Sequence, residues 1–128
     1  MTQTRPARTG DGRELAQTAV RLALEKKAAD PVVLDLRELE GVSDYFVIVS
    51  AASEVQVKAV ADHVVEQLKE TRSVRPWHVE GLDGRRWVLL DYVDFVVHVF
   101  HERTREYYLL ERLWGDAKRI EIADDRPA

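Results

Sequence analysis

The 128-residue sequence contains no cysteine, and this absence removes several kinds of chemistry at once. A disulfide framework, a thiolate-ligated zinc or iron–sulfur centre and a cysteine nucleophile are all excluded. No apolar run approaches the roughly 18–20 residues that a membrane-spanning helix needs. Residues 1–13 carry three arginines but no apolar stretch, so they do not resemble a secretory signal. We therefore expect a cytoplasmic protein without a membrane partner.

The six glycines of the chain form none of the loops that bind nucleotides or present a nucleophile. The patterns G-x-G-x-x-G, G-x-x-x-x-G-K-[ST] and G-x-S-x-G are all missing. The odd spacing of His98 and His101 places them on opposite faces of a strand, which disfavours a shared metal. Asp91 and Asp94 flank a turn and could hold a hard cation, but no phosphate-binding glycine or lysine accompanies them. We expect no cofactor and no metal.

The chain has no excess of positive charge. Its 19 lysines and arginines against 23 aspartates and glutamates give a net charge of −4. Proteins that neutralise many phosphates carry a basic surface, so we expect direct RNA contact to be minor and a basic partner to fit better. Six arginines scattered over the second half could contact phosphates, but we expect most of them at the solvated surface: Arg72, Arg75, Arg85, Arg86, Arg103 and Arg105. Glutamates interrupt the group in the third helix, so a continuous basic stripe is not expected.

Hydrophobic residues make up 45% of the chain, enough for one core in a domain of this length. Composition predicts a mobile arm over residues 1–10, one folded domain over 11–120 and a short tail over 121–128. Apolar periodicity predicts helices over about 12–29, 53–71 and 103–117, and strands over 32–36, 45–50, 77–80, 87–92 and 95–100.

This order of segments predicts an α/β fold with a mixed five-stranded sheet flanked by about three helices. The second helix is long enough for a right-handed parallel crossover, and the last three strands are spaced as a meander. Ser53 and Gln56 have the spacing of a capping box, as do Asp11 and Glu14. Asp30-Pro31 predicts the end of the first helix, because proline disfavours helical backbone in the residue before it.

Three helices are too few to cover both faces of such a sheet. Five strands about 4.8 Å apart span roughly 24 Å, and a helix is roughly 10 Å across, so each face needs two. The strand over 87–92 nevertheless has apolar residues on both faces: one face carries Trp87, Leu89 and Asp91, and the other carries Val88, Leu90 and Tyr92. An open apolar strip beside carboxylates is typical of a protein interface. The alternative is that Trp87 is simply a core residue.

The most specific patterns lie in six segments: V-S-D-Y-F-V-I-V-S (42–50), A-D-H-V-V (61–65), V-E-G (79–81), W-V-L-L-D-Y-V-D (87–94), V-V-H-V-F (96–100) and R-E-Y-Y-L-L-E-R-L-W (105–114). In this order and spacing they resemble the ribosomal silencing factor family, also called the Iojap family. The resemblance covers roughly Leu15 to Ala117.

The resemblance implies an interaction protein and not an enzyme. Members of this family bind the large ribosomal subunit at ribosomal protein L fourteen, block joining of the small subunit and repress translation when nutrients are short. Organellar relatives are linked to assembly of the large subunit, and homodimers occur. The implied fold is nucleotidyltransferase-like without the catalytic carboxylates.

The resemblance also implies a site for the ribosomal protein on the W-x-x-x-D strand and its neighbourhood. Here that site falls on Trp87, Val88, Leu89, Asp91, Tyr92 and Asp94. We expect the two aromatic residues and Leu89 to anchor the partner, and the two aspartates to pair with its lysines or arginines. Because side chains alternate along a strand, at least one anchor must reach round an edge or a bend.

Two positions depart from the family pattern. Val93 stands in a turn where the family commonly has glycine, and a β-branched residue tolerates positive φ poorly, so we expect another turn geometry. Leu110 replaces a residue that is usually acidic and adds to an apolar patch that would suit a dimer contact. Two other functions stay open: a nucleotidyltransferase-like enzyme using Asp91, Asp94 and Mg²⁺, and a homodimer that buries the open strip.

Overall fold

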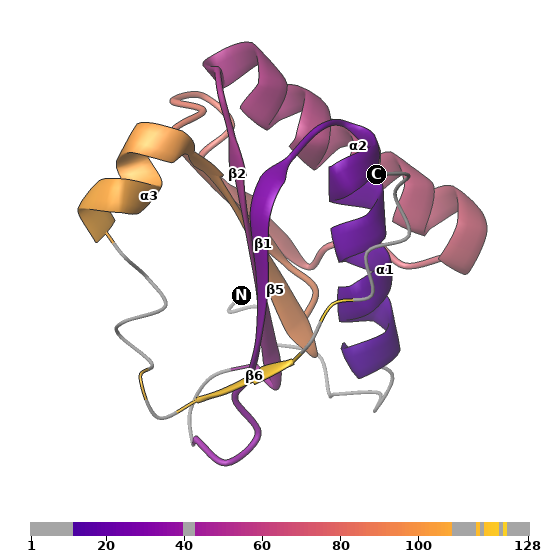
Figure 1. The fold of residues 1–128 in the computed structure, drawn as a ribbon. Helices are drawn as coiled ribbons and strands as arrows, with labels where there is room; N and C mark the ends of the chain where they lie inside the picture. Colours follow the sequence, from indigo (N-terminus) through magenta and orange to yellow (C-terminus); the bar gives the residue numbers. More distant parts are fainter. Residues whose placement is uncertain (1–11, 40–42, 109–114, 116, 121, 123–128) are drawn as a thin grey trace, which may run out of the picture.

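The computed structural model describes residues 12–39, 43–108, 115, 117–120 and 122, which form one sheet between two layers of helix (Figure 1). No helix within these ranges is both long and apolar enough to cross a membrane. The elements are α1 (Gly12–Glu25), β1 (Ala29–Asp35), β2 (Tyr45–Ala51), α2 (Glu54–Arg72), β3 (His78–Glu80), β4 (Trp87–Asp91), β5 (Phe95–His101), α3 (Glu102–Tyr108) and β6 (Lys118–Ile120).

The sheet is mixed, as predicted, with the strand order β3-β4-β5-β2-β1-β6. The β2–β5 pair is parallel and the other pairs are antiparallel. The predicted meander is confirmed as β3–β4–β5. The crossover through α2 links β2 to β3, which is parallel to β2 and is separated from it in the sheet by β5 and β4. The predicted count of five strands was wrong, because β6 adds a sixth strand beside β1.

The first helix ends at Glu25, not at residue 29. Lys27 adopts a left-handed backbone with φ of +66°, and the Ala28 amide donates to the Ala23 carbonyl at 3.2 Å, which closes the helix end. Pro31 instead lies inside β1, where the pairing with β2 shifts register. A left-handed lysine, and not the proline, therefore terminates α1.

The second helix begins as predicted, whereas the third differs from its predicted bounds. The Ser53 hydroxyl accepts from the Gln56 amide at 3.1 Å, and the Gln56 side chain accepts from the Ala52 amide at 2.8 Å. The end predicted at residue 117 was wrong, because Gly115 lies in a turn and Lys118 begins β6. Asp11, Leu110 and the rest of residues 109–114 lie outside the described residues.

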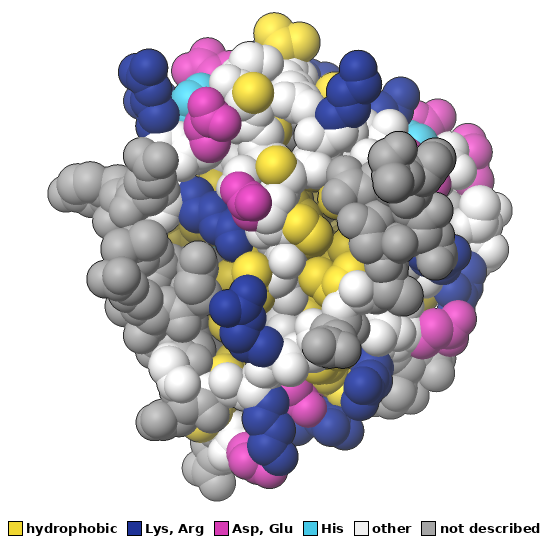
Figure 2. Space-filling view, in the orientation of Figure 1, with side chains coloured by type: hydrophobic (Ala, Val, Ile, Leu, Met, Phe, Trp, Pro, Cys, Tyr) yellow, Lys and Arg dark blue, Asp and Glu magenta, His cyan; other side chains and the backbone are white. Residues whose placement is uncertain are grey.

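The core has one apolar cluster on each face of the sheet. The first lies beneath α1 and α2, and the second lies on the face that carries α3 (Figure 1). Strand β4 contributes to both: Val88, Leu90 and Tyr92 belong to the first cluster, while Trp87 and Leu89 pack against the second. The alternation predicted for this strand is confirmed. Figure 2 shows hydrophobic side chains between charged ones on the side where β1 and α1 face the viewer.

The turn between β4 and β5 differs from the expectation for Val93. This residue has a φ of +76°, a positive value that a β-branched residue disfavours. The Asp94 amide donates to the Tyr92 carbonyl at 2.9 Å, as in a γ-turn with positive φ at its centre. The Asp91 carboxylate accepts from the Val93 amide, and the Ser43 hydroxyl donates to the Val93 carbonyl, both at 2.8 Å. These contacts impose the strained geometry.

The strain at Val93 predicts that the glycine variant is more stable than the alanine variant at this position, the reverse of the usual order in a strand. In an extended strand glycine is less stable than alanine by about 0.5–1 kcal/mol. A positive φ costs an alanine about 1–2 kcal/mol, so Val93→Gly should be more stable than Val93→Ala by roughly 0.5–1 kcal/mol. Urea unfolding of both proteins measures the difference. The control pair Val96→Gly and Val96→Ala, at a buried position in β5, should keep the usual order. The same order at both positions would contradict the prediction.

Candidate functional site

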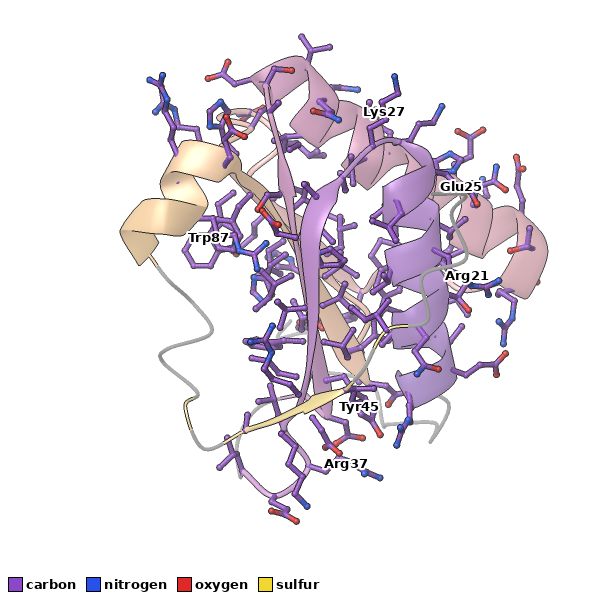
Figure 3. The ribbon with its side chains drawn as sticks, viewed as in Figure 1. Arg21, Glu25, Lys27, Arg37, Tyr45 and Trp87 are labelled. Atoms are coloured by element: carbon purple, nitrogen blue, oxygen red, sulfur yellow. The ribbon has the colours of Figure 1, made fainter. Side chains whose placement is uncertain are left out.

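Trp87 lies at the start of β4 on the face of the sheet that carries α3 (Figure 3). Its ring stacks on Phe100 with centroids 5.0 Å apart, and its indole N–H donates to Nδ1 of His98 at 3.0 Å. The side chain is partly exposed, as is that of Leu89, two residues further along the same face. One large aromatic ring is therefore held in a fixed orientation at the surface, with an aliphatic neighbour beside it.

His98 is the residue that fixes this orientation. It is 3% exposed, lies opposite Leu89 in the β4–β5 register and contacts Phe46 edge-on at 4.5 Å. Burial lowers the pKa of His98 to about 3, so the ring is neutral at pH 7. Because Nδ1 accepts from Trp87, the neutral ring carries its proton on Nε2, a buried atom with no hydrogen-bond partner. The imidazole therefore binds Trp87 through Nδ1 while its Nε2 proton remains without a hydrogen-bond acceptor.

Sequence reasoning considered His98 only as a candidate metal ligand and did not predict its hydrogen bond with Trp87. Two signals bear on it: His98 has the same strand parity as Phe100, and it belongs to the strand that follows β4 in the meander. The pairing register, which places Leu89 opposite His98, is needed to complete the inference. Within the described residues no group of three or more histidines, aspartates and glutamates is arranged to hold a metal ion.

Two other residues of the predicted site lie on the opposite face of the sheet. Val88 is fully buried beneath the helices, and Tyr92 is 6% exposed with its ring stacked on Phe95 at 4.7 Å. Burial raises the pKa of Tyr92, so its hydroxyl stays neutral. The structure therefore does not bring these two side chains to the surface that Trp87 and Leu89 share.

The two aspartates of the predicted site are buried, Asp91 at the end of β4 and Asp94 in the turn that follows. Asp91 is 7% exposed and accepts from the Val93 amide, while Asp94 is 4% exposed. A Cβ added to Gly12 would lie 3.0 Å from the Asp94 Cβ, so this carboxylate sits beside the first turn of α1, where the helix dipole favours negative charge. Both residues contribute to the packing of the turn.

Arg105 holds α3 against β1 and β2. This side chain is 9% exposed, and its Nη1 donates to the Asp30 carbonyl at 2.6 Å and to the Ser50 hydroxyl at 2.9 Å. The sequence grouped Arg105 with arginines that could meet phosphate, but its contacts are within the protein. On the face seen in Figure 2, lysines and arginines are interspersed with aspartates and glutamates, and no continuous basic stripe forms among the side chains drawn there.

The depressed pKa of His98 predicts a loss of stability on acidification. The unfolded chain takes up a proton near pH 6.5, whereas the folded chain does so near pH 3. Between these values the unfolded state binds more protons. The free energy of unfolding therefore decreases as the pH is lowered, by up to about 1.4 kcal/mol per pH unit. Urea unfolding at pH 7, 5.5 and 4.5 measures this slope.

The matched control for the pH slope is His98→Gln, which keeps an acceptor for Trp87 and does not titrate. Its slope should be shallower than that of the wild type. Carboxylates such as Asp35, whose pKa the Arg37 side chain lowers by hydrogen bonding, contribute equally to both proteins. Parallel stability profiles for the two proteins would contradict a buried neutral histidine.

Comparisons with known proteins give a consistent result. The family model "Ribosomal silencing factor during starvation" matches residues 9–128. Ribosomal silencing factor RsfS from Halalkalibacterium halodurans is 41% identical over 109 residues, which are 85% of this chain and 92% of that protein. The mouse protein "Mitochondrial assembly of ribosomal large subunit protein 1" is 33% identical over 97 residues, 74% of this chain and 42% of its own length.

The fold is also shared with solved structures. The crystal structure of a Chromobacterium violaceum protein superposes with a TM-score of 0.77 at 33% identity, covering 88% of this chain and 92% of that one. The family model covers most of the chain, and the H. halodurans relative matches along nearly its whole length. This chain therefore belongs to the ribosomal silencing factor family, whose role is regulatory and related to the ribosome.

Proposed function

We propose that this protein binds the large ribosomal subunit through ribosomal protein L fourteen and represses translation by blocking the joining of the small subunit. Membership of the ribosomal silencing factor family supports the ribosomal role. The observation that carries the proposal is the surface made by Trp87 and Leu89, where His98 and Phe100 hold a large aromatic ring in place. A repressor of this kind would act in the cytoplasm. It needs a binding surface and enough volume to block the small subunit, and it needs no catalytic group.

A fixed tryptophan is well suited to anchor a protein partner. Tryptophan is enriched among residues whose truncation costs 2 kcal/mol or more, and a side chain already ordered in the free protein loses little entropy on binding. Trp87 and Leu89 make the direct contact in this proposal. Val88, Asp91, Tyr92 and Asp94 act indirectly, because they hold β4 and its turn in the position that presents these two side chains.

A role in assembling the large subunit is the second candidate. The name of the mouse relative refers to assembly of the mitochondrial large subunit, and 74% of this chain aligns with it. The same surface would serve in both roles, because each requires binding to the large subunit. The two functions differ in whether the bound protein prevents subunit joining.

Replacement of Trp87 tests the contact. We expect Trp87→Ala to weaken binding to purified large subunits about 30-fold or more, since a lost anchor costs about 2 kcal/mol. Trp77→Ala is the matched control: it makes the same chemical change just before β3 and should alter the affinity less than threefold. Sedimentation of the labelled proteins with large subunits measures both. Equal affinities for the wild type and Trp87→Ala would refute the contact surface.

A joining assay separates the two functions. Light scattering of mixed large and small subunits should show less association when the wild-type protein is added. When Trp87→Ala is added in its place, association should be close to that without any added protein. Binding to the large subunit without any effect on joining would favour the assembly role.

A further inference from the structure

The helical layer formed by α1 and α2 does not extend to the β3 edge of the sheet. The main contacts of α1 are with β1, β2 and β5, and those of α2 are with β2, β4 and β5. Strand β3 lies beyond β4 at the end of the sheet. Six strands about 4.8 Å apart span roughly 29 Å, whereas two helices cover about 20 Å. Both edge strands, β3 and β6, lie outside these main contacts, and at the β3 edge an open strip of sheet remains beside α2.

A groove of about 510 Å³ occupies this place. Its floor is apolar: Ala61 and Val65 come from α2, Val79 from β3 and Leu90 from β4. Leu82 of the β3–β4 loop also lines the groove and is 38% exposed, more than most large apolar side chains among the described residues.

The loop that presents Leu82 has a defined conformation. Gly81 has a φ of +90°, and a Cβ at this position would lie 2.0 Å from the Trp87 carbonyl oxygen. The Arg85 amide donates to the Gly81 carbonyl at 2.9 Å and closes the loop. The apolar groove is therefore built into the hairpin and bounded by an ordered turn.

One wall of the groove is acidic. Asp62, Glu66 and Glu70 follow each other at four-residue spacing along α2, and Lys69 is the cation among the lining residues. Lys58 pairs with Asp62 at 2.5 Å, but Glu66 and Glu70 form no ion pair within the described part of the chain. Like charges at i, i+4 destabilise a helix by a few tenths of a kcal/mol, so a basic partner would relieve a repulsion already present.

We propose that this groove binds an amphipathic helix of a partner protein, with its apolar stripe on the floor and its lysines or arginines facing Glu66 and Glu70. The apolar floor, the open strip of sheet beside α2 and the acidic wall all fit this occupant. The groove lies on the face of the sheet opposite to Trp87, so both surfaces can be occupied at once. The inference goes beyond the proposed contact with the large subunit and does not depend on it.

The test titrates the ¹⁵N-labelled full-length protein with a synthetic 18-residue peptide of leucine and lysine, in which the leucines form one helical stripe. Amide shifts should concentrate at Ala61, Val65, Val79 and Leu82. The double variant Glu66→Lys with Glu70→Lys should weaken peptide binding at least tenfold. The control Glu38→Lys with Glu102→Lys makes the same change in net charge at exposed positions outside the groove and should alter binding less than twofold.

Four results would overturn the proposal. Equal weakening by both double variants would show that only net charge matters. Shifts centred on Trp87 and Leu89 would place the peptide on the other face, and equal binding of a leucine–glutamate peptide would remove the role of the acidic wall. Shifts of the groove residues with protein concentration alone would show that a second copy of this chain occupies the groove. Large-subunit binding by the groove variants, measured in parallel, reports separately on the Trp87 surface.

Discussion

The parallel pairing of β2 with β5 is the interaction on which the rest of the structure depends. It joins residues 45–51 to residues 95–101 in continuous register at the middle of the sheet. All seven residues of β2 are buried, as are the residues of β5 from Phe95 to Phe100. Because each buried aliphatic or aromatic side chain contributes about 1.5–3 kcal/mol, both faces of this pair must be covered. Helices therefore lie on both sides, and β4 and β1 flank the pair.

The elements that sequence reasoning located are those whose signal lies within a few neighbouring residues. The stripe from Val57 to Leu68 marks α2, and the apolar run at 45–50 marks a strand buried on both faces. The elements it misplaced depend on distant contacts. Strand β6 has three residues and exists through its pairing with β1, while α1 ends at a left-handed Lys27, a residue type without the preference that glycine has.

The candidate site divides in the same way. Strand alternation was enough to place Trp87 and Leu89 on one face and Val88 and Tyr92 on the other. It did not show that Asp91 and Asp94 would be buried, because that depends on how the turn packs against Gly12 and Ser43. The positive φ of Val93 was missed for the same reason: contacts from Asp91 and from a segment fifty residues earlier outweigh the local preference of valine.

The close approach of Gly81 to Trp87 has a mechanical consequence. The Trp87 side chain projects to one face of the sheet, while its carbonyl oxygen lies against the Gly81 Cα in the loop that bounds the other face. The loop and the backbone of the tryptophan are therefore in direct contact, without any intervening side chain. Truncating the indole leaves this link intact, whereas one added methyl group at residue 81 would force the two backbones apart and disturb both faces together.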